Sequence, residues 1–340
     1  MSTAARKAPA FRLDFEKPLV ELEKSIDDLR SKNNAHGLKL TEQIAELEKR
    51  CEQLLREIHQ NLTPWQRVQI ARHPGRPYML DYVRACCSEF IEVHGDRLFG
   101  DDRAIVGGFA KLGRHRCVVL GHQKGRDTKE RQMRNFGMAN PEGYRKALRL
   151  MRLADRFRLP IITFVDTPGA YPGVGAEERH ISEAIAVNLR EMFSLSVPVL
   201  SVIIGEGGSG GALGIAVADR VLMLENAYYS VISPEGCAAI LWKDRAHSPQ
   251  AAEALKLSAK DLLALGIIDE IIPEPLGGAH RAPEHMEISL QQHLIRNLDK
   301  LMELPVPERL EARYQRFRKM GAWHELAPPP PAETTPPSHN

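Results

Sequence analysis

The residues with the most chemical content form a glycine-rich run, Gly205-Glu206-Gly207-Gly208-Ser209-Gly210-Gly211, directly after the apolar segment Pro198 to Ile204. The pattern predicts a buried strand, a turn with almost no side chains and the start of a helix. Such a turn leaves backbone N–H groups free at the positive end of the helix, where they can bind an anion or a developing oxyanion.

A dinucleotide-binding fingerprint also fits these residues. Gly205-x-Gly207-x-x-Gly210 has the required spacing, and Glu225 stands where a ribose-binding acid would be expected. However, the run lies two-thirds of the way along the chain, and the helix after it has only about nine residues before the next strand begins at Val221. Both features disfavour a nucleotide site.

The nucleophile elbow of a serine hydrolase is the third candidate, because Gly207-x-Ser209-x-Gly211 has its pattern. A triad would then need an acid and a histidine after Ser209, such as Asp219 or Asp244 with His247. These residues leave little room for the remaining strands of a hydrolase sheet. A backbone oxyanion hole needs only glycine amides at a helix start, so it is the favoured interpretation.

Two other loops follow predicted strands and could contribute to the same site. Residues 121–137 carry five basic side chains, and they form either a solvated loop or a site for a phosphate or carboxylate: Lys124, Arg126, Lys129, Arg131 and Arg134. Residues 165–169 (VDTPG) resemble a GTPase switch, but no Gly-x-x-x-x-Gly-Lys-Ser/Thr run accompanies them. We therefore interpret residues 166–175 as either a structural turn or one wall of an active site.

Composition excludes several classes of protein. The 340 residues are 43% hydrophobic with a formal charge of +2, which indicates an ordinary globular protein without an overall bias toward nucleic acid. The thirteen histidines show no metal-binding spacing, and the five cysteines include no Cys-x-x-Cys pair, so we expect neither a metal site nor a disulfide framework. No apolar run could span a membrane and no secretory signal is present, so we expect a cytoplasmic protein.

The elements that must position these residues alternate between strands and helices, which predicts an α/β fold with buried strands. Strands are expected at 104–110, 117–122, 160–166, 198–204, 221–225 and 267–272, and helices at 141–157, 177–193, 210–218, 234–242, 249–265 and 288–302. A basic helix over 307–319 is expected to present a solvated face, with a polyanion site as the alternative.

The sequence also suggests a division into parts. Residues 1–10 are expected to be a disordered leader, 11–75 an N-terminal helical hairpin or arm broken near Gly37, 76–320 the main domain and 321–340 a disordered proline-rich tail. The arm could pack on its own domain or make a subunit contact.

Taken together, these motifs resemble the family of bacterial-type acetyl-CoA carboxylase carboxyltransferase alpha subunits, over roughly residues 12–320. The matching segments are GHQKGR at 121–126, RNFGM at 134–138, PEGYRKA at 141–147, FVDTPGAYPG at 164–173, GEGGSGGA at 205–212, YSVISPEGC at 229–237 and IPEPLGGAHR at 272–281.

The resemblance implies a crotonase-like fold of repeated ββα units wound into a spiral. It implies a heterotetramer of two alpha and two beta subunits that moves a carboxyl group from carboxybiotin, on a biotin carboxyl carrier protein, to acetyl-CoA. The product would be malonyl-CoA for fatty-acid synthesis. The beta partner would carry the zinc, and a partner biotin carboxylase would use the ATP.

By the same resemblance, the backbone amides of Gly210 and Gly211 would hold the ureido oxygen of biotin. Interactions with substrate are expected for Gly207 and Gly208, for Gly169 and Tyr171, and for Lys124 and Arg126, the last two through CoA phosphates or the transferred carboxylate. The chain alone would be inactive, because the beta subunit would complete the site.

Overall fold

The computed structural model describes residues 11, 13–36 and 40–321, without the side chains of 34–36. The expected disordered leader, the break at Gly37 and the proline-rich tail beyond Gly321 lie outside the described residues.

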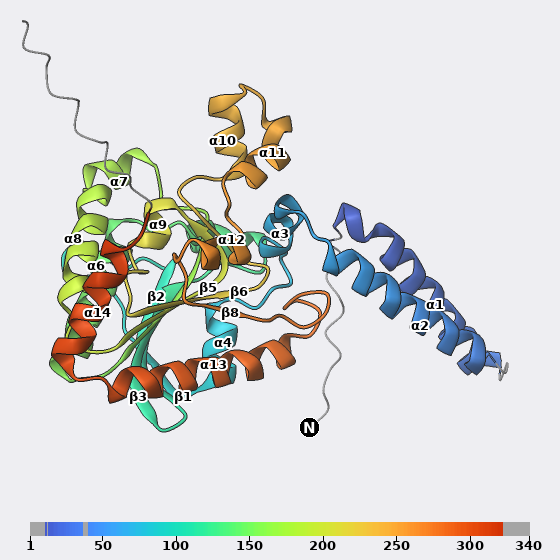
Figure 1. Cartoon of the computed structure of the whole chain (residues 1–340), viewed down its shortest axis with the longest axis horizontal. Coiled ribbons are helices and arrows are strands. Elements are labelled where there is room, and N and C mark those ends of the chain that lie inside the picture. The colour runs from blue at the N-terminus through green and yellow to red at the C-terminus, as the bar shows by residue number, and fades with distance from the viewer. Residues whose placement is uncertain (1–10, 12, 37–39, 322–340) are drawn as a thin grey trace, which may run out of the picture.

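One mixed sheet forms the centre of the molecule, with strand order β1-β2-β3-β4-β5-β6-β8 and β7 paired to the end of β5 (Figure 1). The first three strands are antiparallel and the others are parallel. The strands are β1 Cys87–Glu92, β2 Ile105–Leu112, β3 His115–His122, β4 Ile161–Thr167, β5 Val199–Gly208, β6 Arg220–Leu224, β7 Tyr228–Ser230 and β8 Glu270–Ile272. Strands β4 and β5 are buried along their whole length, as expected for parallel strands covered on both faces.

Helices cover this sheet on both faces (Figure 1). Helices α6 and α8 pack on each other, and α13 and α4 pack together beside β1. The elements after the N-terminal hairpin are α3 Pro64–Ala71, α4 Met79–Cys86, α5 Thr128–Met133, η2 Asn135–Gly137, α6 Pro141–Arg156, α7 Val174–Glu178, α8 Ile181–Ser194, α9 Ser209–Leu213, α10 Pro234–Leu241, η3 Arg245–His247, α11 Ser248–Ala254, α12 Ala259–Ala264, α13 Pro283–Glu303 and α14 Val306–Arg318.

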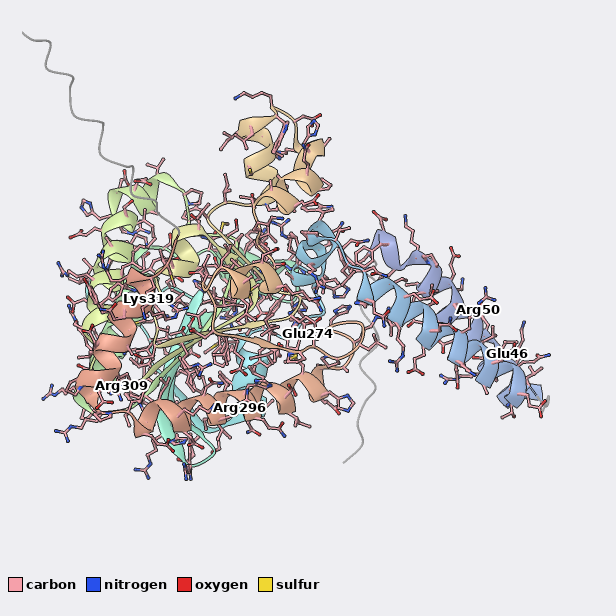
Figure 2. All side chains as sticks on the ribbon, viewed as in Figure 1. Glu46, Arg50, Glu274, Arg296, Arg309 and Lys319 are labelled. Atoms are coloured by element: carbon pink, nitrogen blue, oxygen red, sulfur yellow. The ribbon has the colours of Figure 1, made fainter. Side chains whose placement is uncertain are left out.

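The N-terminal hairpin consists of η1 Asp14–Glu16, α1 Lys17–His36 and α2 Thr41–Gln60, and it projects away from the body (Figure 1). Glu46 and Arg50 lie on this projecting part (Figure 2). In contrast, Val68 and Ala71 of α3 pack against Tyr228 in the body. The division at residue 75 therefore stays a proposal, with α3 already in contact with the main domain.

The predicted α/β architecture is confirmed, and so is the helix expected at 141–157. Two segments that were each predicted to form one helix form two helices in the structure. The helix expected at 177–193 is interrupted at His180, which has a positive φ of 62°. The one expected at 249–265 is two helices, because Ser258 caps a new helix by accepting a hydrogen bond from the Asp261 amide.

The basic helix α14 is also not the solvated face that its composition suggested. Arg309 and Lys319 mark its two ends in Figure 2, and Arg309 is buried. The Arg313 side chain has no exposed surface, forms an ion pair with Asp219 and donates to carbonyl oxygens of the α8–β5 connection. Helix α14 is thus bound to the body through its arginines.

Candidate active site

The glycine-rich run forms the predicted junction between a strand and a helix, but β5 continues through Gly208 instead of ending at residue 204, and α9 ends at Leu213 instead of residue 218. Strand β5 ends at Gly208, next to Thr167 at the end of the parallel strand β4. Ligands of open α/β sheets bind outside the carboxyl ends of such strands. The turn and the loop after β4 therefore stand where this architecture places a site.

Backbone contact between these two segments explains two of the glycines. A Cβ atom on Gly208 would lie 2.2 Å from the carbonyl oxygen of Pro168, and one on Gly211 would lie 2.3 Å from the nitrogen of Ala170. Gly210 differs, because a Cβ there would find no atom nearer than 3.8 Å, on Ile185. Gly208 and Gly211 are thus required by the fold itself, whereas open space lies beside Gly210.

Two buried side chains form hydrogen bonds with α9 and with Gly214, the residue that follows it. The Tyr144 hydroxyl donates to the carbonyl oxygen of Gly211 at 3.1 Å. The Asn188 amide donates to the carbonyl oxygens of Gly214 and Tyr144, each at 3.0 Å. Carbonyls of a short helix are thereby fixed, while the N–H groups of its first turn have no acceptor within the helix.

A network of charges lies at the end of β5. The Glu206 carboxylate accepts hydrogen bonds from Arg72 Nε at 2.7 Å, Tyr228 Oη at 2.8 Å and Lys124 Nζ at 2.6 Å. Lys124 Nζ also donates to Asp166 Oδ1 at 2.7 Å, and that oxygen accepts the amide of Glu206. Burial would raise the pKa of Glu206, but the charges of Lys124 and Arg72 outweigh it and lower the pKa to about 2. Glu206 is therefore a carboxylate at neutral pH.

Lys124 and Arg126 are both occupied by groups of the protein. Lys124 is 13% exposed, and although burial alone would lower the pKa of its ammonium, Asp166 and Glu206 raise it above its ordinary value. Arg126 pairs with Asp81, donates to the carbonyl oxygens of Pro74 and Arg76, and lies over the Tyr78 ring. The expected contacts of both side chains with CoA or a carboxylate remain predictions.

The other expected residues surround the turn. Gly207 pairs with Tyr229 of β7, so it lies inside the sheet. Gly169 has a φ of 155°, and its carbonyl oxygen accepts the Thr167 hydroxyl. The amide of Tyr171 donates to the carbonyl oxygen of Ala139, which fixes the loop after β4 to the start of α6.

Ser209 has the backbone of an elbow, with a φ of 50° between a strand and a helix, and it is exposed. Among the residues described, however, its side chain forms no hydrogen bond to a histidine, whereas a serine nucleophile is activated by an adjacent general base.

Sequence reasoning missed Arg72, Tyr144 and the role of Glu206. A signal for Glu206 was present, because a charged residue at the end of an apolar strand requires a partner. Arg72 stands in a Pro/Gly-rich turn that indicated only a chain boundary, and nothing in the pattern of α6 distinguishes Tyr144 from an ordinary core residue.

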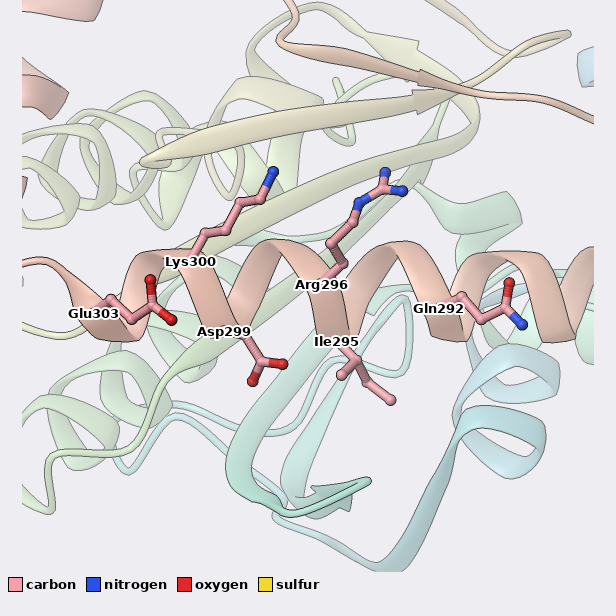
Figure 3. A pocket seen from close by; sticks show the side chains of 6 residues that line it. All are labelled: Gln292, Ile295, Arg296, Asp299, Lys300 and Glu303. Atoms are coloured by element: carbon pink, nitrogen blue, oxygen red, sulfur yellow. The ribbon is translucent and has the colours of Figure 1, made fainter.

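The shallow hollow along α13 is not part of this site (Figure 3). Its lining comes from one helix, and Asp299 in it already binds Arg114 and His115. In the described part of the chain, no three His, Cys, Asp or Glu side chains are grouped to hold a metal ion. No described helix is long and apolar enough to cross a membrane.

Comparisons with known proteins agree on one family. The family model described as acetyl co-enzyme A carboxylase carboxyltransferase-like matches residues 12–321. The chain is 59% identical over 94% of its length to the acetyl-coenzyme A carboxylase carboxyl transferase subunit alpha of Geobacter metallireducens, covering all of that protein. It is 57% identical over 93% of its length to the subunit of the same name from Burkholderia multivorans, covering 98% of it.

Solved structures share the fold at low sequence identity. A transcarboxylase 12S chain matches 76% of this chain with a TM-score of 0.54 and 17% identity, and this chain spans 46% of its length. The beta subunit of Pseudomonas aeruginosa geranyl-CoA carboxylase matches 74% with a TM-score of 0.53 and 16% identity, and again 46% of that chain is covered. These are carboxyltransferases of the crotonase fold, so the predicted fold class is confirmed.

Proposed function

This chain belongs to the family of acetyl-CoA carboxylase carboxyltransferase alpha subunits, and we propose that its β5–α9 turn is half of a carboxyl-transfer site that a beta subunit completes. With that subunit it transfers a carboxyl group to acetyl-CoA, forming malonyl-CoA. The observation that carries this function is the similarity to alpha subunits over nearly the whole of both chains.

The carboxyl donor would be biotin carried by a separate carrier protein and carboxylated by a partner biotin carboxylase. Carboxybiotin supplies the carboxyl group, and negative charge develops on its ureido oxygen as the group leaves. Gly210 and Gly211 would donate backbone N–H groups to that oxygen and so stabilise the transition state more than the ground state.

The packing of the turn supports this assignment. The half-exposed Gly210 has open space where a side chain would project, so a planar ring could approach the backbone there. Gly208 and Gly211 hold the turn against the loop after β4, which contains Gly169 and Tyr171 as the proposed wall. Tyr144 and Asn188 fix the carbonyl groups of α9, so the donors do not need to reorganise during the reaction.

Lys124 and Arg126 stay proposed contacts for CoA phosphates or the transferred carboxylate, and both also hold neighbouring segments of the site in place. Lys124 supports Glu206 behind the turn, and Arg126 ties the loop at 121–137 to residues 74–81. No general base is demanded of this chain, because the nitrogen released from carboxybiotin can take the methyl proton of acetyl-CoA.

Reverse carboxyl transfer from malonyl-CoA to free biotin tests the proposal, with the purified chain alone and with a beta subunit. Activity is expected only in the complex, and activity of the isolated chain would overturn the divided site. In the complex, Gly210→Ala and then Gly210→Val should lower kcat progressively. Valine keeps the backbone N–H, but its branched side chain would hold the ureido oxygen away from it. Loss of one oxyanion donor costs ~10²–10³ in rate in well-studied cases, so Gly210→Val should approach that range. Unchanged turnover in a folded Gly210→Val complex would refute the role of the turn.

A further inference from the structure

Arg72 connects three segments of the chain that are distant in sequence. Its Nε donates to Glu206 Oε1 at 2.7 Å, its guanidinium pairs with Glu235, and a terminal nitrogen donates to Tyr228 Oη at 3.2 Å. The Tyr228 hydroxyl in turn donates to the same oxygen of Glu206 at 2.8 Å. The Arg72 guanidinium thus forms a closed ring of hydrogen bonds with the Tyr228 hydroxyl and Glu206 Oε1, next to the glycine-rich turn.

The two carboxylates that Arg72 binds belong to different parts of the fold. Glu206 directly precedes Gly207 and is 9% exposed. Glu235 lies in the first turn of α10 and is 32% exposed. Helix α10, η3 and α11 form a lobe (residues 234–254) that stands apart from the body beside α3 (Figure 1).

The lobe has few other links of this kind to the turn. Within the lobe, Cys237 and Ala238 pack against Ala251 and Trp242. Ala252 of α11 belongs to a second apolar cluster, shared with Val68, Ala71 and Tyr228 of the body. The lobe contacts the body through α3, whose last residue precedes Arg72. The Glu206–Arg72–Glu235 bridge is therefore a direct polar path from the lobe to the turn.

We propose that Arg72 is a positioning residue for carboxyl transfer, holding Glu206 and with it the Gly207–Gly211 turn in place relative to the lobe. This inference rests on the proposed function of the turn. A planar guanidinium is suited to the task, because it can bind two carboxylates and a hydroxyl at once in fixed directions.

Loss of Arg72 leaves Glu206 with Lys124 and Tyr228 as partners, so the fold can survive while the turn loses one support. Misplacement of catalytic groups by about 1 Å can cost ~10²-fold in rate. In the assembled complex, Arg72→Met should therefore lower kcat by roughly 10- to 100-fold with KM for malonyl-CoA little changed. Arg72→Lys should restore part of the loss, because a single ammonium keeps the charge without the fork.

The pH profile separates positioning from a general loss of structure. Glu206 faces Lys124, Arg72, Tyr228 and Asp166, with Glu235 and Arg76 beyond them. Without the positive charge of Arg72, burial should raise the pKa of Glu206, and its protonated form no longer pairs with Lys124. The kcat of Arg72→Met should consequently fall as the pH is lowered, in a range where the wild-type complex keeps its activity.

Two further variants make the test decisive. Glu235→Gln keeps the Arg72–Glu206 pair and removes only the charge on the lobe, so a several-fold lower kcat is expected. Arg152→Met is the matched control, since Arg152 pairs with Glu191 on the surface between α6 and α8, and its kcat should equal that of the wild type.

Wild-type kcat in both Arg72→Met and Glu235→Gln would overturn the inference. If Arg72→Met does not assemble, Glu235→Gln decides alone. Failure of the inference is distinguishable from failure of the proposed function, because an inactive Gly210→Val together with a fully active Arg72→Met rejects only the role of Arg72. A fully active Gly210→Val would reject the function of the turn whatever Arg72 does.

Discussion

Tyr144 of α6 donates its hydroxyl hydrogen to the carbonyl oxygen of Gly211 across a sequence separation of 67 residues. Both groups are buried, and burial raises the pKa of the Tyr144 phenol, so it remains a donor at all physiological pH values. The geometry of the proposed oxyanion hole therefore depends on a residue that touches no substrate.

Tyr144→Phe tests that dependence. The variant leaves a buried carbonyl without its donor, which should lower the free energy of unfolding by about 1–3 kcal/mol. We also expect a lower kcat in the complex, measured by reverse carboxyl transfer at saturating malonyl-CoA. Tyr314→Phe on the exposed face of α14 is the control, and equal kcat values for the two variants would contradict the anchoring role.

Substitution by alanine should lower the free energy of unfolding at Gly211 but not at Gly210. Gly211→Ala places Cβ against the Ala170 backbone, and such overpacking costs about 1–3 kcal/mol or more. Gly210→Ala meets open space and should leave the unfolding free energy unchanged or slightly higher. Urea denaturation of the two variants measures the difference, and equal midpoints would show that the loop after β4 moves aside.

Ser209 is expected to be replaceable. Its φ of 50° costs an L-residue roughly 1–2 kcal/mol, so Ser209→Gly should not lower the unfolding free energy. Because no base in the described part of the chain hydrogen-bonds its hydroxyl, Ser209→Gly and Ser209→Ala should both retain most carboxyl-transfer activity. Complete loss of activity in both variants, with the complex still assembled, would instead support a serine nucleophile.

Arg313 should be among the residues most important for stability. Arg313→Met would leave Asp219 buried without its ion-pair partner, and breaking a buried pair costs about 3–5 kcal/mol. Arg318→Met, on the exposed side of the same helix, should change the unfolding free energy little. Thermal or urea unfolding compares the two, and a similar loss in both would mean that the charge of α14 matters rather than this pair.

His280 should make the folded state sensitive to acid. Burial, assisted by the neighbouring His73, Arg76 and Arg281, lowers its pKa from 6.5 to about 2, and its ring stacks on His73 with centroids 3.9 Å apart. Below pH 6.5 the unfolded chain binds a proton here that the folded chain does not. The unfolding free energy should therefore fall with decreasing pH, by up to ~1.4 kcal/mol per pH unit for this group.

His280→Phe removes that proton-binding difference. The variant should lose less stability than the wild type between pH 7 and pH 5, as measured by urea denaturation at each pH. His285→Phe, at an exposed position of α13, should keep the wild-type dependence. The contrary result would be an unchanged pH dependence in a folded His280→Phe.

The parts of the fold that the sequence predicted well are those governed by local rules. The apolar run before Gly205 and the glycines after it produced the strand and turn of β5 and α9. Predictions were wrong where a single residue decided the outcome. The positive φ of His180 separates two helices, and the cap at Ser258 starts another, although neither residue breaks the apolar pattern.

The candidate site was predictable only in its backbone part. The glycine amides are local to one segment, whereas the charges around Glu206 come from residues 72, 124 and 166. No periodicity links residues so distant, because their proximity results from strand order. Lys124 stood out as a basic residue in a charged loop, but only the neighbouring strand β4 reveals that Asp166 binds it.

The arginines before α4 precede their partners by long stretches of chain. Arg72 lies 163 residues before Glu235, and Arg76 lies 198 residues before Glu274, which it binds with two hydrogen bonds. At about 5–20 residues per second, a ribosome needs roughly 10–40 s between the synthesis of Arg76 and that of Glu274. Neither arginine can form its ion pair until Glu235 or Glu274, respectively, has been synthesised. The ion pairs of Arg72 with Glu235 and of Arg76 with Glu274 can therefore form only late in synthesis.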